Sequence, residues 1–228
     1  MSHELTPSSA TEVAAFLKEV NTLPAKTGQG RLIFALDATA SRQPTWDQAC
    51  ELQDAMFEAV SQVGGLQVQL VWYRGQGEFK TSRWFATADP LRQHMVQVRC
   101  LGGLTQIRRV LDHAARESKH HPVNALVFIG DCVEEPPDEL YQRGGQLALL
   151  GIPLFSFHEG GELGAASVLR ELSSLTGGAY CPFDQGSAAQ LKALLSAVAI
   201  YAAGGRAALE YFSHNQGKIV KQLVHQIK

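Results

Sequence analysis

The stretch that decides the fold reads Arg31-Leu-Ile-Phe-Ala-Leu-Asp37-Ala-Thr39-Ala-Ser41. Its apolar run lacks polar alternation, which is typical of a strand covered by helices on both faces, as in a parallel sheet. An acid and two hydroxyls follow at alternate positions, where open α/β sheets place their binding sites. Carboxylate and hydroxyl oxygens are hard ligands of the kind that Mg²⁺ or Mn²⁺ selects. The stretch therefore predicts a buried strand that ends in a candidate metal site.

Strand and helix patterns alternate along the rest of the chain, which predicts a doubly wound, mostly parallel α/β sheet of Rossmann-like type. Leu66 to Tyr73 and Glu78 to Phe85 flank a glycine-rich turn and predict a hairpin, and hence one antiparallel edge strand. Val123 to Asp131 repeats the opening pattern of an apolar strand that finishes in an acid.

The expected organisation has three parts: an N-terminal helix and loop over residues 1–30, the α/β domain over 31–203, and a C-terminal helical extension over 204–228. The extension carries an apolar stripe from Ile219 to Ile227 at helical spacing. A helix that packs back on the domain, a membrane-surface segment and a partner-binding helix all fit this stripe. We favour packing back, because the charge beside the stripe is modest.

Composition narrows the class of protein. The 228 residues carry a formal net charge of -2, with scattered basic residues, which argues against nucleic-acid binding. The four cysteines form no CxxC pair, so we expect reduced, mostly buried thiols. Residues 1–10 show no secretory signal, and no apolar stretch approaches the roughly 18 residues of a membrane span. The expectation is a soluble cytoplasmic protein, with Leu191 to Ala203 as a packed helix.

Three separated pieces of the chain supply one set of oxygen ligands: Asp37, Thr39 and Ser41 after the first strand, Thr105 in a Gly-Gly-Leu-Thr loop, and Asp131 after the fourth strand. If the first and fourth strands are neighbours, all three pieces lie at the same edge of the sheet. Their oxygens would then surround one cation. The alternative for the first piece alone is that it caps the helix that begins near Pro44.

This combination resembles the von Willebrand factor A (VWA) domain and its metal-ion-dependent adhesion site, over about residues 31–203. By that resemblance, Thr39 and Ser41 take the two hydroxyl positions of the family's DxSxS motif, and Thr105 takes the position of its separate threonine. The three hydroxyls would bind the metal directly, and Asp37 and Asp131 would act directly or through water. Thr39 departs from the commoner serine, and the residues around Asp131 depart from the frequent Thr-Asp-Gly version.

The resemblance implies Mg²⁺-dependent (or Mn²⁺-dependent), non-catalytic binding of a protein whose Asp or Glu completes the coordination sphere. It also suggests an adaptor or assembly component of a cytoplasmic complex, for example one with an ATPase. An enzyme of the haloacid-dehalogenase type is the alternative from another class, but Thr39 stands where that chemistry needs a second acid. A VWA scaffold without metal dependence is the third reading. The loop from His158 to Gly164 lacks the spacing of a dinucleotide-binding fingerprint.

Five further side chains lie close to the candidate ligands in sequence. We leave Glu134 and Glu135 out of the metal site, because such a pair is usually a solvated loop or a favourable charge at the start of the following helix. Arg42 and Gln43 would sit on the rim of a binding surface or would be ordinary exposed loop residues. Trp46, at helical spacing with Cys50, is expected in the core.

Overall fold

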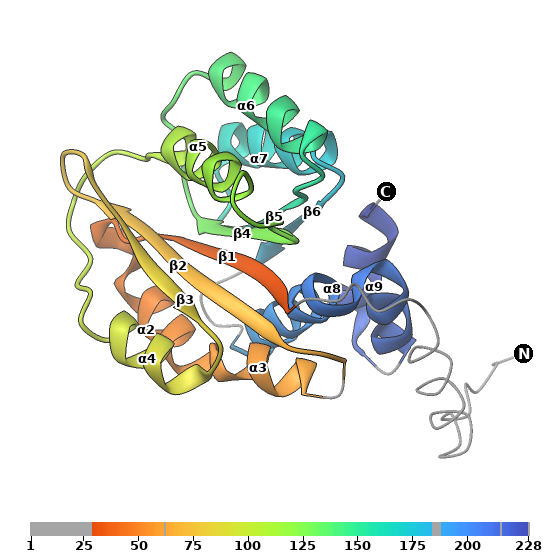
Figure 1. Ribbon diagram of the computed structural model, residues 1–228. Helices are drawn as coiled ribbons and strands as arrows, with labels where there is room; N and C mark the ends of the chain where they lie inside the picture. Colours follow the sequence, from red (N-terminus) through yellow and green to blue (C-terminus); the bar gives the residue numbers. More distant parts are fainter. Residues whose placement is uncertain (1–28, 62, 184–187, 215, 228) are drawn as a thin grey trace, which may run out of the picture.

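The computed structural model of the protein places a six-stranded sheet between two layers of helices (Figure 1). It describes residues 29–61, 63–183, 188–214 and 216–227, so the predicted N-terminal helix lies outside the described residues. The strand order is β3-β2-β1-β4-β5-β6, with β3 antiparallel to β2 and the other described pairs parallel. The strands are β1 (Gly30–Asp37), β2 (Leu66–Arg74), β3 (Glu78–Phe85), β4 (Ala125–Gly130), β5 (Leu154–Glu159) and β6 (Ala179–Phe183). The predicted fold class and the antiparallel edge strand are confirmed.

Strand β1 lies at the centre of the sheet because its side chains are apolar on both faces. Leu32, Phe34 and Leu36 point into one core, and Ile33 and Ala35 point into the other. Its neighbours are β2 on one side and β4 on the other, so the chain reverses its direction of winding at β1. In open α/β sheets, binding sites form at such a switch point, outside the carboxyl ends of the strands.

The helices divide cleanly between the two faces of the sheet (Figure 1). The face of Leu32 is covered by α2 (Gln43–Leu52), α3 (Asp54–Val60), α4 (Ala88–Met95), α8 (Ala188–His214) and α9 (Lys218–Gln226). The face of Ile33 is covered by α5 (Ile107–Glu117), α6 (Pro137–Leu149) and α7 (Leu163–Leu175). A short 3-10 helix, η1 (Ala40–Arg42), joins β1 to α2. The sheet is therefore buried on both sides, as its continuous apolar strands predict.

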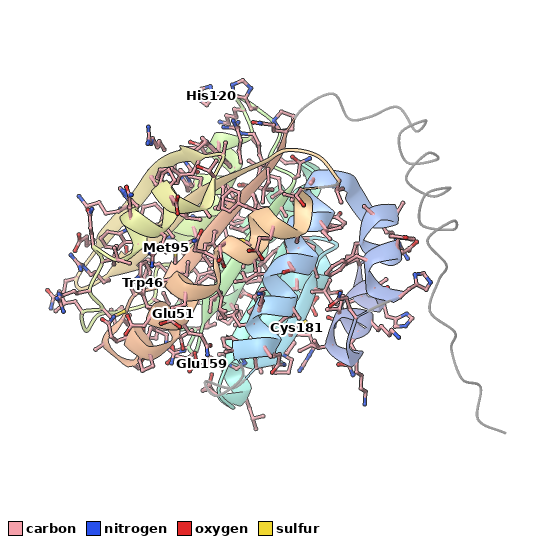
Figure 2. The ribbon with its side chains drawn as sticks, turned by 90° about the horizontal axis from the view of Figure 1, so that it is seen from below. Trp46, Glu51, Met95, His120, Glu159 and Cys181 are labelled. Atoms are coloured by element: carbon pink, nitrogen blue, oxygen red, sulfur yellow. The ribbon has the colours of Figure 1, made fainter. Side chains whose placement is uncertain are left out.

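Trp46 on α2 is a core residue, as predicted. It is 1 % exposed, and its indole N–H donates a 3.0 Å hydrogen bond to the carbonyl of Met95 at the end of α4. Figure 2 shows the two side by side beneath the sheet. A buried indole needs such an acceptor, so this bond lets the ring fill the core without an unpaired polar atom.

The C-terminal extension packs on the domain. Helix α9 buries Val220, Leu223 and Val224, and the following Ile227 is also buried. The side-chain carbonyl of Gln226 accepts a 2.9 Å hydrogen bond from the backbone N–H of Tyr180 on edge strand β6. The helix therefore covers apolar surface beside an otherwise unpaired strand edge.

Helix α8 is long and apolar enough to cross a membrane on length and composition alone, and it is the one such helix among the described residues. The sequence-based expectation of no such stretch is therefore wrong. Half of the stretch is buried within the domain, where α8 lies against α3 and β1. Leu191, Leu194 and Val198 have no exposed surface. The position of α8 is that of a core helix.

The four cysteines are free thiols. Cys50 and Cys181 are buried, whereas Cys100 and Cys132 are half-buried. The expectation of mostly buried thiols is thus met by two of the four.

Candidate metal site at the carboxyl edge of the sheet

Three neighbouring strands bring carboxylates to the same edge of the sheet. Asp37 ends β1, Asp131 follows β4 directly, and Glu159 ends β5. Because these strands are parallel and adjacent, their carboxyl ends lie side by side. The switch point therefore collects negative charge at the place where open α/β sheets bind ligands.

Asp37 is the most deeply buried of the predicted acids, with 3 % of its surface exposed. Its Oδ1 accepts a 2.7 Å hydrogen bond from the backbone N–H of Thr39, whereas Oδ2 is buried and finds no hydrogen-bond partner among the described residues. Gly130 makes room for the ring of Phe128, since a Cβ there would lie 2.8 Å from that ring, and only at ordinary contact distance from Asp37. The carboxylate is thus held in the interior with the Thr39 backbone and the Tyr73 hydroxyl as its polar neighbours.

Burial raises the pKa of Asp37 to about 6, against the opposing hydrogen bonds from Thr39 and with a further contribution from the charge of Asp131. Tyr73 is the partner of Asp37 in the β1–β2 register, and its buried hydroxyl interacts with the Asp37 carboxylate, which keeps the pKa of Asp37 from rising further, although neither group makes a hydrogen bond of ordinary geometry to the other. Burial, and then the charges of Asp37, Glu135 and Asp131, hold the pKa of Tyr73 well above its ordinary value. The surroundings of Asp37 are therefore short of positive charge.

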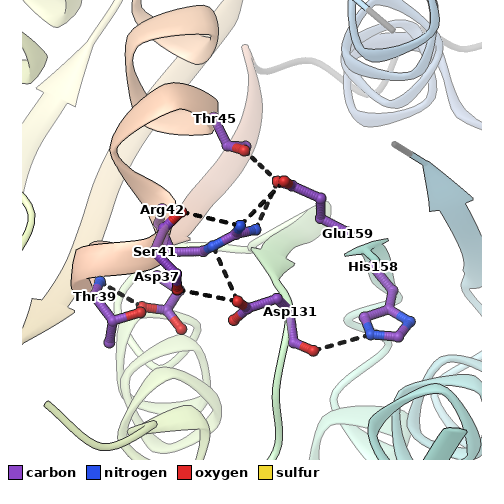
Figure 3. Close-up of polar contacts among 8 residues, drawn as sticks. All are labelled: Asp37, Thr39, Ser41, Arg42, Thr45, Asp131, His158 and Glu159. Atoms are coloured by element: carbon purple, nitrogen blue, oxygen red, sulfur yellow. Dashed lines mark hydrogen bonds and ion pairs between the residues drawn. The ribbon is translucent and has the colours of Figure 1, made fainter. Parts of the chain in front are cut away.

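Ser41 and Arg42 share one oxygen of Asp131 (Figure 3). The Ser41 hydroxyl donates a 3.1 Å hydrogen bond to Oδ2 of Asp131, and Nε of Arg42 lies 3.3 Å from the same oxygen. Ser41 is exposed, but Arg42 is only 5 % exposed. The prediction that Arg42 lies on an exposed rim or loop is therefore wrong, because η1 turns its side chain inward toward the acids.

Arg42 is anchored by Glu159. Its Nη1 and Nη2 donate hydrogen bonds of 2.6 and 3.0 Å to the two carboxylate oxygens of Glu159, and the Thr45 hydroxyl donates to the same carboxylate. Both members of the ion pair have side chains that are 6 % exposed. A guanidinium that forks onto a carboxylate is the strongest common arrangement of such a pair. The side chains drawn in Figure 3 show Arg42 between Glu159 and Asp131.

His158 fixes the backbone of the loop that carries Asp131. Its Nε2 lies 3.1 Å from the carbonyl oxygen of Asp131, and its Nδ1 lies 2.8 Å from the hydroxyl of Tyr180. A carbonyl only accepts, so Nε2 donates and Nδ1 accepts from Tyr180. His158 has no exposed surface and thereby fixes where the loop leaves β4.

Thr105 lies in a second cluster, formed with the next part of the same loop. Its hydroxyl donates a 3.1 Å hydrogen bond to Glu135 and accepts a 3.0 Å bond from the backbone N–H of Glu134. Its own N–H donates a 2.8 Å bond to the carboxylate of Glu134. Thr105 is 7 % exposed. The threonine is therefore fully bonded within this cluster.

The loop that carries Thr105 is fixed against the first motif. The backbone N–H of Leu101 donates a 2.9 Å hydrogen bond to the carbonyl of Ala38, directly after β1. Gly103 touches the β2–β3 turn so closely that a Cβ there would lie 2.2 Å from the carbonyl oxygen of Gly75. A side chain at position 103 would displace the loop, and glycine is what permits this approach.

Glu135 caps helix α5. Its carboxylate accepts hydrogen bonds of 2.9 and 2.7 Å from the backbone N–H groups of Ile107 and Arg108. The sequence suggested a solvated loop, or a charge at the start of the helix that follows Pro136. The charge instead serves the first turn of α5, which lies beside this loop, and the capping residue comes from outside the helix.

The structure thus brings four predicted ligands together and connects the fifth through a loop. One group contains Asp37, Thr39, Ser41 and Asp131. Thr105 is hydrogen-bonded to Glu134 and Glu135, which lie on the same loop as Asp131. The described residues contain no group of three or more His, Cys, Asp or Glu side chains placed to hold a metal. A cation here would therefore depend on hydroxyl oxygens as well as carboxylates. The buried Asp37 carboxylate, which has no ion pair among the described residues, and the hard oxygen donors around it fit Mg²⁺ or Mn²⁺.

Sequence reasoning missed Glu159 as a member of the site, and it placed Arg42 on an exposed rim or loop instead of among the acids. Glu159 had a detectable signal, because the run from Leu154 to Glu159 ends an apolar strand in an acid, as Asp37 does. Arg42 had none. Its inward position depends on a carboxylate 117 residues away in the chain.

Comparison with known proteins supports the fold. No protein-family model matches the sequence, and no curated protein matches it. Many solved structures match the fold of this chain. A von Willebrand factor type A protein from Catenulispora acidiphila aligns with a TM-score of 0.60 and 14 % identity, over 78 % of this chain and 43 % of the other.

Two further structural matches agree. The VWA domain of SpRpn10 aligns with a TM-score of 0.58 and 9 % identity, over 72 % of this chain and 95 % of that domain. The human COPII-coat protein Sec24c aligns with a TM-score of 0.53 and 12 % identity, over 80 % of this chain and 32 % of the other. The chain spans less than half the length of the Catenulispora protein but nearly all of the SpRpn10 domain. The fold is that of a VWA domain.

Proposed function

We propose that the protein is a divalent-cation-dependent, non-catalytic module that binds another protein at the carboxyl edge of its sheet. The observation that carries the proposal is the buried Asp37 carboxylate, which has no cationic partner among the described residues and whose Oδ2 makes no hydrogen bond of ordinary geometry, in a cluster of carboxylates and hydroxyls at the switch point. A buried charge without a partner is costly, and a bound cation would remove that cost. VWA domains typically bind proteins, which agrees with this site.

The residues that would hold the cation are the hydroxyls of Thr39 and Ser41 and the carboxylates of Asp37 and Asp131. The Thr105 hydroxyl would join them only by giving up its hydrogen bond to Glu135. Bound Mg²⁺ supplies an open coordination position that an Asp or Glu of the partner can complete. The chain itself supplies the rest: Ser41 orients Asp131, and His158 fixes the loop on which Asp131 lies.

Exposed leucines beside the site support a protein partner. Leu101 and Leu104 are 57 % and 65 % exposed and belong to the loop that carries Thr105. Leu163 is 84 % exposed at the start of α7, which follows the carboxyl end of β5. Protein contact surfaces combine an apolar core with a polar rim, and these leucines would supply apolar contact area next to the polar site. We further propose that the partner belongs to a cytoplasmic multi-subunit complex, in which this module acts as an adaptor.

The test is capture of partners from a cell extract with and without EDTA, with the bound proteins identified. The proposal expects a defined set of partners that EDTA releases and excess Mg²⁺ restores. Asp37→Asn should lose these partners, whereas the control Asp112→Asn should keep them, because Asp112 lies on α5 and pairs with Arg143. Capture that EDTA leaves unchanged would favour a metal-independent scaffold. Phosphoester hydrolysis that Asp37→Asn abolishes would favour an enzyme instead.

A further inference from the structure

One guanidinium in the site is shared by two carboxylates from different strands. Arg42 donates two hydrogen bonds to Glu159 at the end of β5, and its Nε faces Asp131 after β4 at 3.3 Å. Arg42 also donates a 3.2 Å bond to the carbonyl of Ser41. Its side chain is 6 % exposed. The cluster of acids therefore already contains one fixed positive charge.

The two contacts of Arg42 are unequal. The pair with Glu159 is a two-bond fork, and the Thr45 hydroxyl donates to the same carboxylate. The contact with Asp131 is an ion pair without the alignment of a hydrogen bond. Asp131 is also the more accessible acid, with a side chain 28 % exposed against 6 % for Glu159. Glu159 therefore anchors the guanidinium, and Asp131 is the partner that another cation can draw away.

Arg42 faces an oxygen that the site would offer to a metal. Oδ2 of Asp131 accepts from Ser41 and lies beside Nε of Arg42, and both Asp131 and Ser41 belong to the proposed ligand set. A positive charge a few ångströms from a cation site opposes the binding of a second positive charge, the more so where the surroundings exclude water. Asp37, the other acid of the set, forms no ion pair within the described residues.

We propose that Arg42 and a divalent cation compete for Asp131, so that the Arg42 guanidinium sets how tightly the site holds the cation. This inference rests on the proposed function, because it assumes that the cation binds at Asp37 and Asp131. It makes the site a weak one in the resting protein. A partner carboxylate that adds a ligand then strengthens cation binding, and cation and partner bind together.

The test is calorimetric titration of MgCl₂, and separately of MnCl₂, into the full chain. Arg42→Met with Glu159→Gln removes both charges of the anchor together, retains an acceptor for Thr45 and leaves the net charge unchanged. We expect it to bind the cation about tenfold or more tightly than the wild type. Arg42→Lys in the wild-type background keeps a positive charge and should keep the affinity low, which separates charge from packing. Glu159→Gln alone leaves Arg42 with Asp131 as its remaining anionic partner and should weaken binding.

The matched control is Arg143→Met with Asp112→Asn, which neutralises a 3.0 Å ion pair between α5 and α6 and should leave cation affinity unchanged. Thermal unfolding in EDTA verifies that every variant folds. Equal affinities in the wild type and the Arg42→Met/Glu159→Gln variant overturn this inference and leave the proposed function intact. Binding by that variant alone supports the competition and means that the native protein binds the cation only together with its partner. Absence of binding by both overturns both.

Discussion

The two halves of the candidate site differ in how completely their polar groups are satisfied. The Thr105 half is closed: hydroxyl, backbone and the carboxylates of Glu134 and Glu135 bond one another and cap α5. The Asp37 half is open, because the buried Asp37 carboxylate has no ion pair among the described residues and its Oδ2 makes no hydrogen bond of ordinary geometry. The comparison teaches that a cluster of polar groups at a sheet edge does not by itself indicate a ligand. A buried charge without a cationic partner does indicate one, and such a charge is present only in the Asp37 half.

The largest expected effect is the pH dependence that Asp37 imposes. Its pKa is 3.8 when unperturbed and about 6 in the folded protein, so the folded state binds the proton more tightly. The resulting stabilisation is present below the unfolded value and is lost as pH rises through about 6. Without a cation, the free energy of unfolding should fall by up to about 3 kcal/mol between acid and neutral pH from this group.

Asp37→Asn should remove that dependence and stabilise the cation-free protein at neutral pH, because the uncharged amide can still accept from Thr39. Urea denaturation between about pH 4 and pH 7 measures the difference. The control Asp112→Asn removes an exposed carboxylate and should retain the wild-type slope. If Asp37→Asn destabilises the cation-free protein at neutral pH, the open half is already compensated.

The next largest effect is expected from removing Glu135, which caps helix α5 in the Thr105 half of the site. Glu135→Ala removes the acceptors of Ile107, Arg108 and Thr105, and should lower the free energy of unfolding by about 2 kcal/mol. Glu135→Gln retains one good acceptor and should lose less. Denaturation in EDTA is the measurement, because it removes any contribution of a cation. A loss below about 0.5 kcal/mol would show that water replaces the carboxylate and that this half is as open as the other.

The smallest effect is expected at the outer margin of the closed half. Arg108 and Glu139 form a 3.2 Å ion pair whose side chains are 50 % and 47 % exposed. Exposed pairs contribute little, so Arg108→Ala should change the free energy of unfolding by less than about 0.5 kcal/mol. Thermal melts at low and high salt measure it. A larger, salt-sensitive loss would mean that the cluster extends to α6.

Much of the fold could be predicted from the sequence, because strands that are buried on both faces appear as continuous apolar runs. The apolar run before Asp37 and its repetition before Asp131 identify central parallel strands, and the turn at Gly75 identifies the hairpin. The strand ends then place the predicted ligands at one edge. The helix expected to begin near Pro44 is α2, and a second helix, α3, follows it after a break at Gln53.

The side-chain network could not be predicted, because it depends on contacts between residues far apart in the chain. Arg42 reads as a loop residue, and only the approach of β5 to η1 shows that Glu159 draws it inward. Glu135 likewise reads as part of its own loop, although it serves the first turn of α5. Direction and pairing of charged side chains follow from tertiary structure, and local pattern carries little of that information.

The central claim is that a divalent cation completes the open half of the site. Thermal unfolding of the wild type and of Asp37→Asn, each with increasing MgCl₂ at neutral pH, tests it most directly. The account predicts that Mg²⁺ raises the melting temperature of the wild type, by an amount that grows with the logarithm of its concentration above the dissociation constant, and leaves Asp37→Asn unchanged. A wild-type melting temperature that neither Mg²⁺ nor Mn²⁺ alters would contradict the claim.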